Sequence, residues 1–214
     1  GRFIKIKPRA ILGFEWSDFG ATLIATVDAD WASDPKTRCS TSGGVVRLGN
    51  SLLKHWTTTQ PTPSLSTAES EMKAITKGCV ELIYIQNLLK QQGIELELIV
   101  ETDASAAKGA LSRLGCGKRM KHIDVQELWI QQIVKTGRIK VVKISTHDNV
   151  ADFLTKPLDH QSIVKTMQML NYRYLNTDGE FDDIEEYEMP ELEPAEGDEL
   201  MALLLALVTP QTAR

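Results

Sequence analysis

The chain lacks closely spaced cysteines. Its three cysteines, Cys39, Cys79 and Cys116, stand far apart among the 214 residues and cannot all pair with one another. Structural zinc sites need close ligand spacing, and stable disulfides belong to oxidising compartments. The cysteine content therefore gives no sign of a zinc site or a disulfide framework, and it favours a reducing, intracellular compartment.

Long apolar runs are missing as well. The longest run, residues 200–208, has nine residues, about half of what a bilayer requires. The sequence begins with Gly, and it shows no signal peptide. We therefore expect a fragment of a longer product that has no membrane partner.

Bases are nearly absent from residues 176–214, which hold 12 acids and a single base, Arg214. Such an acidic segment, spaced with aromatic residues, predicts disorder. The remaining residues hold 17 acids and 23 bases, and a mildly basic body suggests a polyanionic partner. The overall apolar content of 42% is ordinary for a globular protein, so we expect a folded body with an acidic tail.

The body carries strand patterns first and helix patterns later. Residues 21–28 form an apolar run typical of a buried strand, and Gly49-Asn50 predicts the turn of a hairpin between residues 43–48 and 51–56. The later expected elements are a helix over 66–92 ended by Gly93, a strand over 96–102, helices over 104–114 and 123–134, a strand over 139–144, and a helix over 149–156 stopped by Pro157. This order predicts an α/β fold with a mixed five-stranded sheet, antiparallel in its first hairpins, parallel in its later strands, and flanked by helices.

Four acids from four of these elements are candidates for one site. Asp28 and Asp103 follow strands, and the ends of strands are where sites form in such sheets. Glu71 borders the apolar stripe of the long helix, whereas Glu69 is expected on its solvated face. Asp152 lies in the first turn of the last expected helix. These positions allow Asp28, Glu71, Asp103 and Asp152 to converge, although an aspartate at the end of a strand is more often a turn or cap residue.

Convergent carboxylates need a cation because they repel one another. Mg²⁺ prefers oxygen ligands and keeps several waters, and two such ions about 3.5–4 Å apart can hold the attacking and leaving oxygens of a phosphodiester. Four carboxylates would neutralise most of their charge. The pattern therefore favours a divalent metal site, with a solvated acidic loop as the alternative.

Five stretches of the sequence resemble, in order, the RNase H domain at the end of the polyprotein of copia-type long-terminal-repeat retrotransposons. They are residues 28–44 (DADWASDPKTRCSTSGG), 65–71 (LSTAESE), 101–106 (ETDASA), 121–124 (KHID) and 150–158 (VADFLTKPL). Each alone is a weak signal, but their combination and order are specific to that family.

This resemblance implies an RNase H-like fold and a two-metal nuclease that cuts the RNA strand of an RNA–DNA hybrid. It also implies that Asp28, Glu71, Asp103 and Asp152 are catalytic metal ligands. The implied ions are two Mg²⁺, with Mn²⁺ as a substitute. The implied partners are the hybrid and the reverse transcriptase part of the same polyprotein, in a cytoplasmic virus-like particle or in the nucleus.

Several other residues are candidates for auxiliary roles or for binding nucleic acid. Asp30 is expected on the same side of its strand as Asp28. His147 occupies the region where relatives outside the copia group place a histidine that aids product release, or it is a plain loop residue. Three basic residues, Lys118, Arg119 and Lys121, suit phosphate binding or a solvated loop equally well.

Two other functions remain open at this point. A metal-dependent strand transferase shares the fold and its acids, but there the glutamate follows both aspartates, whereas Glu71 precedes Asp103. A catalytically inactive, nucleic-acid-binding remnant of a retrotransposon polyprotein is the other alternative. In either case four segments are expected. They are an N-terminal part over 1–20, interpreted as a remnant of the preceding connection region, an RNase H-like domain over 21–160, an extension over 161–175, and an acidic tail with a short apolar segment over 176–214.

Overall fold

The computed structural model describes residues 10–14, 20–105, 109 and 125–174. In chain order the elements are β1 (Ala10–Leu12), β2 (Thr22–Asp30), β3 (Thr41–Leu48), β4 (Ser51–Thr59), α2 (Thr67–Lys90), β5 (Glu97–Thr102), α4 (Val125–Lys135), β6 (Lys140–Lys143), the 3₁₀ turns η1 (Thr146–Asp148) and η2 (Asp152–Leu154), α5 (His160–Met169) and β7 (Tyr172–Tyr174).

A five-stranded sheet in the order β4-β3-β2-β5-β6 forms the centre of the fold. The first three strands pair antiparallel, whereas β5 pairs parallel with both β2 and β6. The predicted mixed sheet, with antiparallel hairpins first and parallel strands later, is therefore confirmed. The hairpin turn at Gly49-Asn50 is confirmed too, because Leu48 and Ser51 are partners and Gly49 has a positive φ of 54°.

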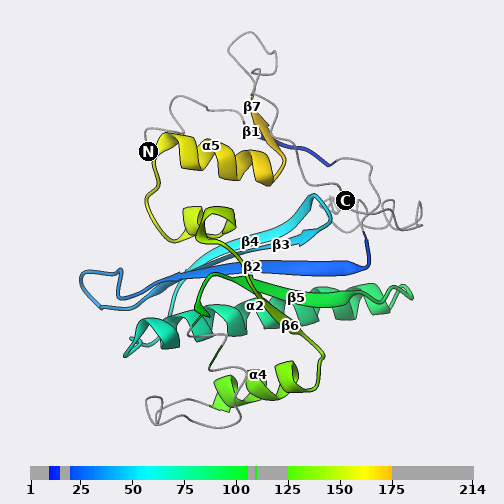
Figure 1. Ribbon diagram of the computed structural model, residues 1–214, viewed down its shortest axis with the longest axis horizontal. Coiled ribbons are helices and arrows are strands. Elements are labelled where there is room, and N and C mark those ends of the chain that lie inside the picture. Colours follow the sequence, from blue (N-terminus) through cyan, green and yellow to red (C-terminus); the bar gives the residue numbers. More distant parts are fainter. Residues whose placement is uncertain (1–9, 15–19, 106–108, 110–124, 175–214) are drawn as a thin grey trace, which may run out of the picture.

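Helix α2 covers one face of this sheet, and α4 lies beyond it (Figure 1). The core between sheet and helix is built from alternate residues of β2, such as Leu23, Ala25 and Val27, packed against the apolar stripe of α2. Gly78 of α2 permits this close packing, because a Cβ there would lie 2.8 Å from a methyl carbon of Val27. Since side chains alternate along a strand, Asp28 faces the opposite side of the sheet.

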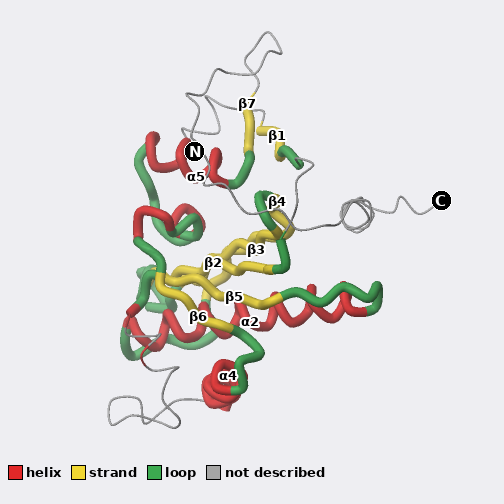
Figure 2. Tube along the Cα trace, turned by 45° about the vertical axis from the view of Figure 1, so that its right-hand side comes forward, coloured by secondary structure: helices red, strands yellow, loops and turns green. Residues whose placement is uncertain are grey.

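The segment 149–170 covers that opposite side. Val45 and Leu52 of the sheet are buried together with Val150 and Leu170, and Phe153 and Leu154 pack against this cluster. Figure 2 shows the resulting layers, with α5 on one side of the strands and α2 and α4 on the other. This second apolar cluster thus holds the sequence motif over 150–158 against the sheet.

A two-stranded antiparallel sheet joins the two ends of the described chain. In it β1 pairs with β7, with Ile11 opposite Arg173. The pairing links the segment expected over 1–20 to the extension expected over 161–175, and the sequence patterns did not indicate it. The proposed segment boundaries themselves stay predictions, and the acidic tail lies outside the described residues.

The predicted helix over residues 149–156 is wrong. The structure has only the short 3₁₀ turn η2 within these residues, and the turn η1 lies just before them. Asn149 explains the difference, because its side-chain oxygen accepts from the backbone N–H of Ala151 at 3.1 Å and competes with helical bonding. Pro157 limits the other end by disfavouring helical backbone at the preceding residue.

The other predicted elements agree with the structure within a few residues. Ser66 caps α2 by accepting from the backbone N–H of Glu69, as the capping box predicts, and α2 ends at Lys90 ahead of Gly93. The predicted helix over 104–114 falls mostly outside the described residues, as do the first two residues of the helix predicted over 123–134. Among the helices that are described, none combines the length and the apolar character that crossing a membrane requires.

Candidate functional site

The register between β2 and β5 brings two of the predicted acids together. Thr26 is the partner of Glu101 in this parallel pair. Two residues further along each strand, on the same face, come Asp28 and Asp103. Asp28 is buried, with 1% of its surface exposed, and Asp103 is half-buried just after β5.

Asp152 joins these two acids from the segment that crosses the sheet. It is the first residue of η2, which contacts β2 and β3. Gly43, the partner of Asp28 in β3, makes this approach possible, because a Cβ there would lie 2.8 Å from side-chain carbons of Leu154 and Thr155. As a result, Asp28, Asp103 and Asp152 each offer a carboxylate oxygen within 4.8 Å of the others.

Glu71 of α2 is the fourth predicted acid. Its carboxyl group is largely buried, the backbone of Ala29 hydrogen-bonds to it, and its Oε2 atom has no hydrogen-bond partner. Burial, together with the negative charges of Asp28 and Asp103, raises the pKa of Glu71 to about 8. Glu71 is thus electrostatically part of the cluster, although it is not among the three acids whose oxygens lie within 4.8 Å of one another.

Two residues of this site were missed by the sequence analysis. The Lys156 ammonium lies 3.2 Å from Asp28 Oδ1 and 3.2 Å from Asp152 Oδ1. The Thr155 hydroxyl donates a hydrogen bond to Asp28 Oδ2. Both residues belong to the motif over 150–158, and the spacing of four between Asp152 and Lys156 was the available signal for an ion pair.

The charge balance also shifts the pKa of two of these groups. Burial and the carboxylate of Asp28 raise the pKa of Asp152 to about 6, and Lys156 opposes this rise. For Lys156, burial alone would lower the pKa, but the carboxylates of Asp28 and Asp152 raise it above its ordinary value. The ammonium is therefore held in its charged form between the two acids.

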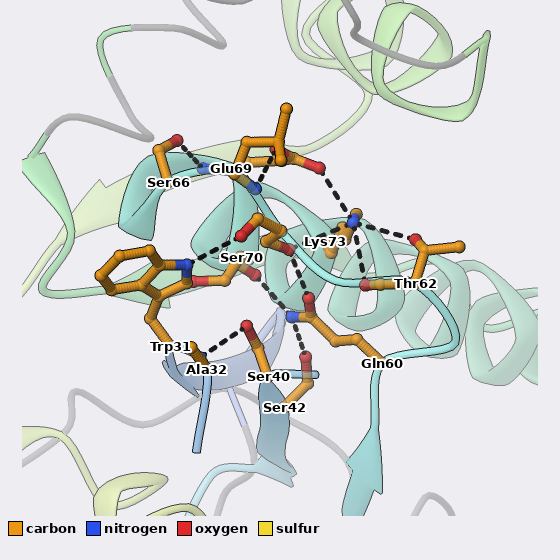
Figure 3. Close-up of polar contacts among 12 residues, drawn as sticks. Trp31, Ala32, Ser40, Ser42, Gln60, Thr62, Ser66, Glu69, Ser70 and Lys73 are labelled. Carbon is orange, nitrogen blue, oxygen red and sulfur yellow. Dashed lines mark hydrogen bonds and ion pairs between the residues drawn. The ribbon is translucent and has the colours of Figure 1, made fainter. Parts of the chain in front are cut away.

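The expectation that Glu69 lies on the solvated face of α2 is wrong. Only 6% of its surface is exposed, its Oε2 accepts from the backbone N–H of Leu65 at 2.8 Å, and its Oε1 pairs with Lys73 at 3.0 Å. Figure 3 shows why, because the loop before α2 covers this carboxylate. The helical period predicts which side of α2 Glu69 occupies, but it carries no information about the loop that packs against that side.

The same loop fixes the indole of Trp31 beside the helix start (Figure 3). The Trp31 ring nitrogen donates to the backbone oxygen of Ser64 at 2.9 Å, while 45% of the residue stays exposed. The Gln60 side chain braces the loop through Ser42 at 2.8 Å and through the backbone of Ser70 at 2.9 Å. Glu69 and Trp31 thus both bind the loop before α2 rather than standing as independent surface residues.

The auxiliary residues are placed less closely. Asp30 ends β2 and is half-buried, and among the described contacts no hydrogen bond or ion pair joins it to the cluster. His147 is exposed in η1, next to Thr146, whose hydroxyl donates to Asp103 Oδ2 at 2.8 Å. The basic residues Lys118, Arg119 and Lys121 lie outside the described residues, so their predicted role stays untested.

The residues at this site fit a divalent cation. The four acids supply only carboxylate oxygens, which are the ligands that hard ions such as Mg²⁺ prefer. The buried Glu71 Oε2 without a partner is the kind of atom that a bound ion would satisfy. Without such an ion, the proximity of like charges is offset only in part by Lys156.

The raised pKa of Glu71 predicts a pH dependence of stability in the presence of a chelator. Between its ordinary value of 4.5 and its folded value of about 8, the folded chain keeps a proton that the unfolded chain has released. The free energy of unfolding is therefore expected to fall as pH rises through this window, by at most about 1.4 kcal/mol per pH unit from this group.

Denaturant unfolding of the metal-free protein at a series of pH values measures this slope. Glu71→Gln is expected to flatten it above about pH 6, leaving below that pH the smaller contribution of Asp152. A parent protein whose stability rises across the window would contradict the burial of a protonated Glu71.

Comparison with curated proteins finds transposon polyproteins. Over 139 residues the chain is 35% identical to the retrovirus-related Pol polyprotein from transposon RE2 of Arabidopsis thaliana, covering 64% of this chain and 10% of that protein. Over 130 residues it is 35% identical to the corresponding polyprotein from transposon TNT 1-94 of Nicotiana tabacum, covering 60% and 10%. The chain thus spans about a tenth of the length of these relatives. Its homologues are retrotransposon Pol polyproteins, which confirms the resemblance seen in the sequence.

Solved structures whose backbones are similar include an RNase H1 and a reverse transcriptase. One is an RNase H1 isolated from compost, with 15% identity over 69% of this chain and 99% of that one, at a TM-score of 0.46. Another is the foamy viral protease-reverse transcriptase in complex with an RNA/DNA hybrid, with 16% identity, 64% and 20% coverage and a TM-score of 0.43. No family model matches the chain.

Proposed function

We propose that this homologue of transposon Pol polyproteins is a metal-dependent endonuclease that hydrolyses the RNA strand of RNA–DNA hybrids during reverse transcription. The observation that carries the proposal is the convergence of Asp28, Asp103 and Asp152 from β2, β5 and η2. The buried, unpartnered carboxylate oxygen of Glu71 supports it. Phosphodiester hydrolysis is one of the reactions that metal ions held by such carboxylates serve in proteins.

In this proposal the position of each of the four acids decides its role as a metal ligand. Asp28 is the central ligand, because it is the most buried of the three clustered carboxylates and is fixed by the paired strand β2. Asp103 and Asp152 approach from the other elements of the cluster, and Glu71 adds a carboxylate from α2. Two Mg²⁺ ions, or Mn²⁺ in their place, would activate the attacking water and stabilise the leaving oxygen.

The carboxylate cluster alone does not specify the substrate, and the proposal of a hybrid substrate rests on the chemistry of RNA and DNA strands. RNA in a hybrid carries 2′-hydroxyls along a wide minor groove, and DNA does not, so a protein can distinguish the two strands. The half-exposed indole of Trp31 and the exposed His147 are candidates for contacts beside the cluster. The basic stretch with Lys118, Arg119 and Lys121 is a candidate phosphate contact in the proposal.

The decisive test uses end-labelled RNA–DNA hybrid, duplex DNA and single-stranded RNA of one sequence. We expect the purified chain to cut the RNA of the hybrid in the presence of Mg²⁺ or Mn²⁺, to spare the other substrates largely, and to stop when a chelator is added. Nicking of duplex DNA would favour the strand-transferase interpretation instead. Metal-independent binding of the hybrid without any cleavage would favour the inactive remnant.

The context of the activity is part of the same proposal. Because the relatives are polyproteins, the reverse transcriptase part of the same polyprotein is the proposed partner, in a cytoplasmic virus-like particle or in the nucleus. Residues 21–160 are proposed as the nuclease domain. Residues 161–175 would then stabilise this domain through α5 and β7. Strand β7 pairs with β1, which comes from the N-terminal segment.

A further inference from the structure

Lys156 occupies the space between two of the acids that the proposed function makes metal ligands. Its ammonium nitrogen lies 3.2 Å from one oxygen of Asp28 and 3.2 Å from one oxygen of Asp152. The side chain of Asp28 is 1% exposed and that of Asp152 is 15% exposed, whereas Lys156 remains 36% exposed. The lysine therefore enters the cluster from the solvent side and has room to leave it.

A local backbone hydrogen bond places Lys156 beside Asp152. Its N–H donates to the backbone oxygen of Asp152 at 2.9 Å, so the two side chains emerge one turn apart. The hydroxyl of the preceding Thr155 binds the second oxygen of Asp28. Both oxygens of the most buried acid are thus occupied by the segment that also carries Asp152.

A divalent ion and this ammonium compete for the same two carboxylates. An ion held by both Asp28 and Asp152 has to approach an oxygen of each, and Mg²⁺ binds oxygen at about 2.0–2.1 Å. The ammonium already lies 3.2 Å from one oxygen of each, and two cations repel each other strongly at such short range. Binding of the ion therefore requires the ammonium to move away from at least one of the two carboxylates.

We propose that Lys156 is a built-in counter-ion that offsets part of the negative charge of the carboxylate cluster in the metal-free protein and is displaced when a divalent ion binds. The ammonium keeps β2 and the segment 149–156 together while no ion is present, and its competition weakens ion binding. The inference rests on the proposed function, because that function makes Asp28 and Asp152 ligands. In this role Lys156 is a positioning residue that acts on the acids.

Calorimetric titration with Mg²⁺ and with Mn²⁺ tests the competition directly. Lys156→Met keeps the length of the side chain but removes its charge, and we expect its dissociation constant for the ion to be about tenfold lower than that of the parent. Lys90→Met is the matched control, because Lys90 is an exposed lysine at the far end of α2 that pairs with Glu95 at 2.7 Å. The control is expected to bind the ion as the parent does.

Thermal unfolding gives a second readout that does not depend on cleavage. Without metal, Lys156→Met is expected to unfold at a lower temperature than the parent, and the difference is expected to vanish at saturating Mg²⁺. Lys156→Arg retains the charge and is expected to behave like the parent in both measurements. Equal or weaker ion binding by Lys156→Met would overturn the proposal, because a competitor cannot be removed without a gain in affinity.

The parent protein itself provides a test in case the variant does not fold. Acetylation of lysines, followed by mass spectrometry, reports how available each ammonium group is to the reagent. We expect the modification of Lys156 to be slow without metal and to accelerate when Mg²⁺ is added, with Lys90 as the internal reference. Unchanged acetylation of Lys156 on addition of Mg²⁺ would overturn the displacement.

These outcomes separate the inference from the proposed function. If the parent binds Mg²⁺ and cuts the hybrid while Lys156→Met binds the ion no more tightly, only the role of Lys156 fails. If neither protein binds a divalent ion at the cluster, the proposed nuclease function fails as well.

Discussion

Replacing Asp28 with asparagine is expected to lower the rate of hybrid cleavage by more than about a thousandfold, which corresponds to about 4 kcal/mol of transition-state stabilisation. Asp28 is the most buried member of the cluster, and the change removes its charge while keeping its shape. The remaining amide oxygen still accepts from Thr155 or Lys156, so the fold is expected to persist. Single-turnover cleavage measures the rate, and circular dichroism with thermal unfolding checks the fold.

Asp34→Asn is the matched control for this prediction. Asp34 lies in the same sequence motif, but its carboxylate binds the backbone of Lys36 at 2.9 Å and the hydroxyl of Thr37 at 2.6 Å within its own loop. The control is expected to cleave as the parent does. A folded Asp28→Asn protein that cuts as fast as the parent would show that Asp28 is not a ligand.

The two glutamates at the start of α2 are expected to respond in opposite ways to the same substitution. Glu71→Gln is expected to abolish cleavage, because it removes one of the four acids, and to leave the metal-free protein at least as stable as the parent above neutral pH, since it removes a buried charge that repels Asp28 and Asp103. Glu69→Gln is expected to leave the cleavage rate unchanged. It breaks the buried contact with Lys73 and weakens the cap at Leu65, at a cost of about 2 kcal/mol in stability.

Each variant of this pair controls for the other. Single-turnover cleavage and denaturant unfolding are measured for both, at a temperature below the unfolding transition of Glu69→Gln. If Glu69→Gln loses cleavage and Glu71→Gln retains it, the assignment of Glu71 to the cluster is wrong. A stable Glu69→Gln protein would instead show that the contacts in Figure 3 contribute little to the fold.

Much of the candidate site could be predicted because its acids belong to elements with strong local signals. The apolar run of β2 and the capping box of α2 fix where Asp28 and Glu71 stand on their elements. Asp103 follows a strand that the sequence indicates clearly. The convergence of four acids was expected from these positions. Three of them offer oxygens within 4.8 Å of one another, and Glu71 is not among these three. Their roles as metal ligands remain predictions.

Asp152 was correctly expected near the other acids, but the secondary structure predicted around it was wrong. Its neighbourhood was expected to be a helix, but the bonding of Asn149 to the backbone and the packing of Phe153 and Leu154 on the sheet give a 3₁₀ turn instead. Helical periodicity cannot reveal such an effect, because side-chain competition and tertiary packing override the weak preference of a short segment.

Between β2 and β6 the sequence by itself determined the order of the described elements, the hairpin at Gly49-Asn50 and the helix start at Ser66, because each depends on residues a few positions apart. Only the tertiary structure decided the contacts between residues that are far apart in the chain. The pairing of β1 with β7, the burial of Glu69 under the loop before α2, and the contact of Lys156 with Asp28 are of this kind. These contacts join segments far apart in the chain, and no sequence pattern within either segment indicates its partner. They can stabilise the fold only after the sheet has brought the segments together.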